Sequence, residues 1–453
     1  MESLSIVASF FSKNFNIAAA PRSRGRGVAG KGGVAARRKI SSEICVEIRF
    51  PDALIRPLIF PPHMDFQNLR YSPAVYRAAL GCLFFNQGII FASWASRIAD
   101  VKTNLNLDEA DLGGILFALP LGQVCAMALS GYLVTRFGSR MMALIAGIFY
   151  PAMLVALSLA GTPTALFATL MCFGVAANLN NISINTQAVG VECVYGRSIM
   201  SSFHGLWSLA GFCGGILSAM LAANNVGLFQ SFAGVFVFSV AVTLVARNFI
   251  LPEDIKPEPD PADARKKRTI FSPTPFIIML GVIAFGCMSC EGTMYDWSVV
   301  YFKEVIGADK DSSRMGYIAY MSAMASGRFL GDFMITRFGV IRVLQSSGIL
   351  VFCGMILAVA FPGVAVSSMG FLLVGAGVST VVPTCYSLAG KSRRMSSGMA
   401  IATVSTIGFF GFLMGPPLIG FIAHASSLRW SLATMACIGM LVTILAPRVK
   451  SRL

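Results

Sequence analysis

The chain has 453 residues, of which 55% are hydrophobic and 13% charged, and its formal net charge is +15. Soluble domains carry about 25% charged residues, so this composition excludes a soluble globular protein. Lys and Arg gather in the N-terminal tail and in short loops, the positive-inside pattern of membrane proteins rather than that of a nucleic-acid-binding protein. We find no phosphate-binding loop, zinc motif or nucleophile constellation, so we expect no enzymatic activity, no cofactor, no metal and no nucleic-acid partner.

Residues 1–70 do not read as a membrane span. Seven Lys and Arg residues alternate with Gly and Ala between Arg22 and Lys39, and acidic residues are few, which is typical of a transit peptide. We favour the alternative of an upstream extension from a wrongly chosen start, because Met64 opens a polar run that suits an N-terminus. Under either interpretation we expect this basic stretch to be disordered.

From Tyr76 onward, apolar segments of about 20 residues follow one another, the length that crosses a bilayer as a helix. The twelve segments are predicted at 76–98, 112–134, 141–160, 164–189, 200–223, 228–250, 274–300, 313–335, 342–361, 365–388, 396–423 and 428–446. They predict an all-α membrane protein of two pseudo-symmetric six-helix halves. The halves are predicted at 71–250 and 274–446, with a polar, proline-rich linker at 251–273 and a tail at 447–453.

The basic residues predict the orientation in the membrane. Lys and Arg collect after the second, fourth, sixth, eighth and tenth segments and again at Arg448, Lys450 and Arg452. These positions place both termini and the linker on the cytoplasmic side. We expect a monomer in the cell (inner) membrane, in contact with the lipid bilayer.

One short motif occurs once per half. Thr135-Arg136-Phe137-Gly138 recurs as Thr336-Arg337-Phe338-Gly339, each time between two apolar segments. Glycine suits a tight turn, and arginine is too costly to leave in hydrocarbon, so both turns should lie at the membrane surface. We expect matched gating loops formed by Gly131, Arg136, Gly138, Arg140, Asp332, Arg337 and Gly339.

The wider stretch from Gly131 to Arg140 resembles the signature loop of the major facilitator superfamily, Gly-x-Leu-x-Asp-Arg-x-Gly-Arg-Arg. Thr135 stands in place of the family's Asp, and Ser139 in place of the first trailing basic residue. The resemblance implies a secondary carrier whose two halves alternate access around a central site. The same fold also serves exporters of amphipathic compounds and membrane receptors that transport nothing, and both alternatives stay open.

Polar side chains at membrane depth are site candidates. In the fourth segment, Asn181 and Asn185 share one helix face, and their amides both donate and accept hydrogen bonds, which suits a hydroxyl-bearing solute. Bonds between neighbouring helices are the alternative. His204 and Trp207 also share a face, and this histidine can relay protons or simply pack. The residues that we expect to bind the solute are Asn86, Gln87, Trp94, Asn181, Asn185, His204, Trp207 and Trp297.

Two carboxylates in the seventh segment are the clearest indication of a proton-binding site. Glu291 lies about five residues deeper than Asp296, so we rank it first as a proton carrier and Asp296 second. Arg328 in the eighth segment is a candidate partner for a carboxylate.

The stretches around Trp94, His204 and Glu291 resemble the rhizopine-transporter-like branch of the superfamily, near the fucose permeases. That resemblance implies proton-coupled transport of a small polar, sugar-like solute.

Overall fold

The computed structural model describes residues 69–107, 109–254, 273–309, 312–392 and 394–450, all within one compact unit. Most of the predicted N-terminal extension, most of the linker and the last three residues of the tail lie outside these ranges. The described part is helical and contains no strand. This confirms the predicted all-α class.

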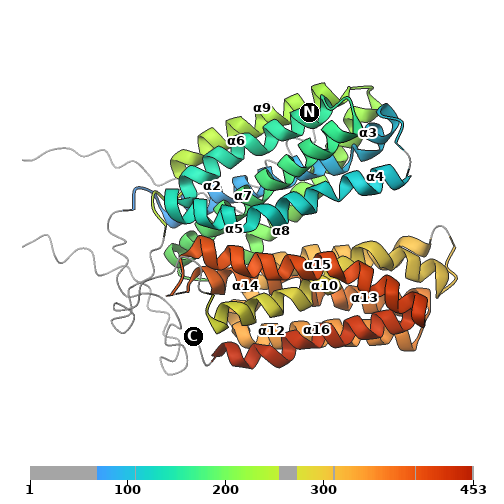
Figure 1. Ribbon diagram of the computed structural model, residues 1–453. Coiled ribbons are helices and arrows are strands. Elements are labelled where there is room, and N and C mark those ends of the chain that lie inside the picture. Colours follow the sequence, from blue (N-terminus) through green and yellow to red (C-terminus); the bar gives the residue numbers. More distant parts are fainter. Residues whose placement is uncertain (1–68, 108, 255–272, 310–311, 393, 451–453) are drawn as a thin grey trace, which may run out of the picture. The chain divides into compact units, whose positions relative to one another are not determined.

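The described residues of the first half form eight α-helices and one 3₁₀ turn, coloured blue to yellow-green in Figure 1. Their bounds are α2 Pro73–Ala95, α3 Ile98–Asn104, α4 Glu109–Leu116, α5 Ala118–Phe137, α6 Ser139–Ser158, α7 Pro163–Tyr195, α8 Met200–Ala223, α9 Leu228–Ala246 and η2 Arg247–Phe249. Helix α2 packs against α8, α5 against α7, and α6 against both α7 and α9.

The second half repeats this arrangement. Its elements are α10 Pro275–Glu304, η3 Ser312–Arg314, α11 Met315–Phe338, α12 Val340–Ala360, α13 Val364–Val378, α14 Val381–Gly390, α15 Ser397–Ala425 and α16 Leu428–Lys450. Helix α10 packs against α15, α11 against α13, and α12 against both α13 and α16. The same four pairings therefore occur in both halves, in the same order along the chain, as a duplicated fold requires.

Within the described residues, eleven helical segments are long and apolar enough to cross a membrane. The eighth predicted span, 313–335, corresponds to α11, which is 24 residues long but is not one of these eleven segments. Helix α11 carries the charged residues Arg328, Asp332 and Arg337. It packs against α13 and α8. Arg328 and Asp332 make hydrogen bonds to residues of α8, whereas Arg337 is exposed.

The tenth predicted span is interrupted. Helix α13 ends at Val378, α14 begins at Val381, and Ser379 and Thr380 lie between them. Pro383 has no N–H to donate and restricts the residue before it, which disfavours a continuous helix here. Helical hydrogen bonding resumes at Thr380, whose carbonyl accepts from the Thr384 N–H at 3.1 Å. Broken helices are tolerated at membrane depth when neighbouring groups satisfy the backbone in this way.

The repeated turns adopt the conformation that their glycines predict. Gly138 has φ 84° and ψ 147°, and Gly339 has φ 83° and ψ 153°. This region is essentially restricted to glycine. The two turns lie at the same end of the helices as the α7–α8 and α14–α15 connections, and we call this the turn end.

Replacing Gly339 by Ala should lower the free energy of unfolding by about 1–3 kcal/mol, the cost of a residue with Cβ in this backbone region. Among the described residues, no atom beyond the chain neighbours lies within 4 Å of the added Cβ, so the loss comes from the backbone conformation. Thermal unfolding in detergent measures it. Gly234→Ala is the matched control, because its Cβ also meets open space but the residue is helical, and it should leave the transition unchanged or raise it. Equal transitions for both variants would contradict the prediction.

Candidate functional site

A buried arginine links the two halves near the middle of the helices. Arg328 on α11 is 8% exposed. Its Nη1 donates to Ser208 Oγ on α8 at 2.5 Å, and its Nη2 lies 3.4 Å from Glu291 Oε1. Glu291 is the seventeenth residue of the 30-residue helix α10. The guanidinium therefore contacts a hydroxyl of the first half and a carboxylate of the second. Its Nε is buried and has no partner among the described residues.

A row of amides continues from this arginine into the first half. Ser208 Oγ also donates to the His204 carbonyl, one turn earlier on α8, at 3.2 Å. The His204 Nε2 lies 3.2 Å from Asn185 Oδ1, and Asn185 Nδ2 donates to Asn181. We call Glu291, Arg328, Ser208, His204, Asn185 and Asn181 the central cluster.

Aromatic side chains flank the central cluster. The His204 ring lies 6.0 Å from the ring of Tyr386 on α14, whose hydroxyl donates to Ser405 Oγ on α15 at 3.0 Å. Near Glu291, the Tyr295 ring is 6.0 Å from the ring of Tyr320 and 6.1 Å from the ring of Phe412. The arrangement offers donors and acceptors from α7 and α8 and ring surfaces from the second half.

Four residues expected at the solute site, Asn86, Gln87, Trp94 and Trp207, are not part of the central cluster, and their role in solute binding stays a prediction. Asn86 donates to the Ser239 carbonyl on α9 at 3.4 Å, and Trp94 is 2% exposed in the hydrophobic core. Gln87 is half-buried. Trp207 is also half-buried, with its ring 6.0 Å from Phe91.

Asp296 and Trp297, the other two candidate residues of the seventh predicted span, differ in burial. Asp296 is exposed, whereas Trp297 is half-buried and its Nε1 has no partner among the described residues. Neither makes a polar contact with the central cluster within the part of the chain that the structure covers.

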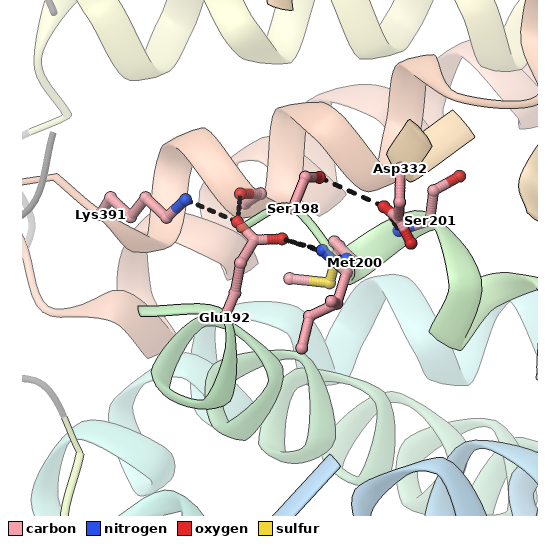
Figure 2. Close-up of polar contacts among 8 residues, drawn as sticks. Glu192, Ser198, Met200, Ser201, Asp332 and Lys391 are labelled. Carbon is pink, nitrogen blue, oxygen red and sulfur yellow. Dashed lines mark hydrogen bonds and ion pairs between the residues drawn. The ribbon is translucent and has the colours of Figure 1, made fainter. Parts of the chain in front are cut away.

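A second polar group joins the halves at the turn end (Figure 2). Glu192, near the end of α7, is 1% exposed. Its Oε2 accepts from the Ile199 and Met200 N–H groups, each at 3.0 Å, and its Oε1 accepts from Ser387 Oγ and from Lys391 Nζ, the latter at 2.5 Å. Burial lowers the pKa of Lys391, but the adjacent Glu192 carboxylate raises it by more. The ammonium therefore stays charged at neutral pH.

Asp332, on the second half, accepts hydrogen bonds from the first half at the start of α8. In Figure 2, Glu192 and Asp332 point toward the same short stretch around Met200. Asp332 Oδ1 accepts from the Ser201 N–H at 3.0 Å and from Ser198 Oγ at 3.2 Å, and its Oδ2 accepts from the Ser202 N–H at 2.7 Å. A carboxylate from α11 thus caps the N-terminus of α8, satisfying free N–H groups and complementing the helix dipole.

Other predicted gating residues lie in and beside the α5–α6 turn, where α5 contacts the start of α15. Thr135 Oγ1 and Ser396 Oγ lie 2.6 Å apart across the halves, and a Cβ on Gly131 would meet the Ala402 side chain at 2.7 Å. Arg140 Nε donates to the Arg247 carbonyl at 3.2 Å. Arg136 and Arg337 are exposed, and the Arg136 guanidinium lies over the Phe137 ring, 5.7 Å from its centroid.

Sequence reasoning missed Glu192, Ser387, Lys391 and Ser208. The repeat carried a signal for the first two. Aligning Met200-Ser201-Ser202 with Met395-Ser396-Ser397 places Glu192 opposite Ser387, and the structure shows these two side chains bonded to each other. Ser208 had no such signal, because a serine within an apolar helix is common.

Comparison with known proteins identifies relatives over most of the chain. The sequence model described as Major Facilitator Superfamily matches residues 79–396. An uncharacterized MFS-type transporter of Yersinia pestis is 33% identical over 369 residues, which cover 81% of this chain and 93% of that protein. Membrane protein MosC of Rhizobium meliloti is 29% identical over 366 residues, which cover 80% and 88%.

Solved structures share the fold. A crystal structure of the transporter FucP in the outward conformation has a TM-score of 0.69 at 15% identity and covers 82% of this chain and 98% of its own. The proton:xylose symporter XylE has a TM-score of 0.64 at 15% identity, covering 82% and 95%. These likenesses confirm the predicted fold of twelve helices in two halves.

Proposed function

Since the chain belongs to the Major Facilitator Superfamily of transporters, we propose that it is a secondary active carrier that moves a small polar solute together with a proton. The two halves rotate about the central cluster and expose it to each side of the membrane in turn. The carrier lies in the cell (inner) membrane, and its turn end faces the cytoplasm, in keeping with the distribution of Lys and Arg.

The observation that carries this proposal is the pair of contacts that Arg328 makes, one with Glu291 and one with Ser208. It joins a titratable carboxylate of one half to a hydroxyl of the other through one buried guanidinium. Protonation of Glu291 removes its charge from the pair, which changes the attraction for Arg328 and so the balance between conformations. A proton that binds preferentially in one conformation is thereby coupled to movement of the halves.

The central cluster also suits a polyhydroxylated solute. Amide and imidazole groups supply donors and acceptors on one side, and tyrosine rings supply flat apolar surface on the other. The fold neighbours FucP and XylE are described as a fucose:proton and a proton:xylose symporter, which agrees with this solute class.

Uptake into proteoliposomes tests the proposal. Purified protein should accumulate at least one member of a panel of radiolabelled sugars, polyols and sugar acids when the outside is acidic, and a protonophore should abolish the accumulation. Absence of any gradient-driven accumulation across the panel would refute proton-coupled transport. Extrusion of amphipathic dyes by the same vesicles would instead indicate an exporter.

Replacing Asn185 by Ala should weaken solute binding by about 0.5–1.5 kcal/mol, or roughly twofold to tenfold in Kd, for each neutral hydrogen bond lost. The structural basis is its position between His204 and Asn181. Calorimetry with the solute identified above measures the effect. Asn224→Ala is the matched control, because that amide is exposed and donates to the Met220 carbonyl of α8, one turn earlier in the chain. Equal affinity of both variants would remove Asn185 from the site.

A further inference from the structure

The formal charges of the central cluster cancel. Arg328 contributes one positive charge, and Glu291 is the sole carboxylate paired with it among the described residues. His204 faces Arg328 from α8, while Cys287, Tyr295, Tyr320 and Tyr386 lie close enough to Glu291 to interact electrostatically. Tyr and Cys side chains are uncharged at neutral pH, and a charged His204 would only add positive charge.

Proton coupling through Glu291 upsets this balance. A protonated Glu291 leaves the buried Arg328 without a counter-charge, and an unpaired charge is costly both in a protein interior and at membrane depth. A neutral solute does not remove that cost. A monoanionic solute does, because the loaded site then holds one positive charge on Arg328 and one negative charge on the solute.

From this charge balance and the free Nε of Arg328 we infer that the solute is a monoanion, whose carboxylate replaces Glu291 as the partner of Arg328. This inference rests on the proposed transport function. A sugar acid combines the required carboxylate with hydroxyl groups for the amide row.

Arg328 has hydrogen-bonding capacity left for such a partner. Of its five N–H groups, one bonds Ser208 closely, another makes a loose 3.4 Å contact with Glu291, and Nε–H has no partner among the described residues. Guanidinium groups favour bidentate pairing with carboxylates through two adjacent N–H groups. About a tenth of each side chain in the pair is exposed, so solvent reaches the edge of the pair.

The proton and the anion then travel together. With the site empty, Glu291 is ionised and pairs with Arg328. With the site loaded, Glu291 carries the proton and the solute pairs with Arg328. Each form has no net charge, so the carrier moves one proton and one monoanion without moving charge across the membrane.

Binding to purified variants tests the inference. Glu291→Gln imitates the protonated state and leaves Arg328 unpaired, whereas the double variant Glu291→Gln/Arg328→Gln removes both charges. The probes are three matched pairs: D-galacturonate and D-galactose, D-glucuronate and D-glucose, D-gluconate and D-glucitol. We expect Glu291→Gln to bind at least one acid about tenfold or more tightly than its neutral partner, and the double variant to lose this preference. Calorimetry at constant ionic strength gives both ratios.

The wild-type protein gives a second measurement that does not depend on either variant folding. Its affinity for the preferred acid should rise as the pH falls toward about 5, where sugar carboxylates stay ionised. Equal or tighter binding of the neutral partners, or no acid binding at all, would overturn the inference. Failure of the proposed function is distinguishable, because it appears as absent gradient-driven uptake even when acid binding is intact.

Discussion

Replacing Lys391 by Met should open the turn end of the protein. Lys391 lies on the second half and is the one cation that the structure pairs with Glu192 among the described residues. Without the ammonium, the Glu192 carboxylate, which is 1% exposed, keeps its backbone N–H and hydroxyl donors but has no counter-charge among the described residues. Breaking one partner from a buried ion pair costs about 3–5 kcal/mol. Because Glu192 keeps its other bonds, we expect about 3 kcal/mol, or roughly a hundredfold change in the ratio of closed to open molecules.

The cost falls on the closed state because opening already separates these groups. Glu192 and the Ile199 and Met200 N–H groups belong to the first half and stay together, whereas Ser387 and Lys391 leave with the second. In the open state water can solvate the Glu192 carboxylate, so the missing ammonium matters less there. The variant therefore shifts the population rather than unfolding the protein.

Distance measurements across the turn end report this shift. Phe137 and Phe338 occupy equivalent places in the repeated motif, one in each half, and both are exposed. Spin labels on noncanonical amino acids at these positions avoid the native cysteines. Lys391→Met should add a longer distance, and Lys391→Arg should keep the wild-type distribution. Lys303→Met, which removes an exposed lysine of α10, is the matched control. An unchanged distribution in Lys391→Met would show that the pair does not hold the turn end closed.

Some features could be predicted from the sequence because their causes are local. The apolar segments set the helices, and Thr162-Pro163 and Thr274-Pro275 mark the starts of α7 and α10, where each threonine caps the helix. The repeated motif indicated both glycine turns. The sequence also suggested Arg328 as a carboxylate partner, and the structure pairs it with Glu291. The coupling role of that pair stays a prediction.

Other features depended on contacts between distant parts of the chain. Helical spacing placed Asn181 and Asn185 on one face but did not say that His204 lies against them. It also could not show that Asn86 turns toward α9 or that Trp94 is buried in the core. Glu192 and Lys391 are 199 positions apart. Periodicity within one helix carries no information about such a pair, since packing between the halves brings it together.

Replacing Glu291 by Gln should abolish uphill, pH-gradient-driven uptake while leaving exchange of solute between equal compartments. Glutamine preserves the shape of protonated glutamate but binds and releases no proton in the working range. The ion pair with Arg328 is then permanently absent, so solute binding and rotation of the halves no longer depend on pH. We expect the variant still to bind solute, because the Arg328 N–H groups are free to donate to the solute's carboxylate.

Two assays on the same vesicles separate these effects. Accumulation of the identified solute under an inward pH gradient should fall to its equilibrium level, whereas counterflow, in which unlabelled solute inside drives entry of labelled solute, should continue. Asp296→Gln is the control, because this exposed carboxylate lies five positions along the same helix, outside the central cluster. If Asp296→Gln abolished accumulation and Glu291→Gln did not, the proton site would belong to Asp296. Undiminished accumulation by Glu291→Gln would exclude Glu291 from coupling, because a glutamine cannot cycle a proton between the two sides of the membrane.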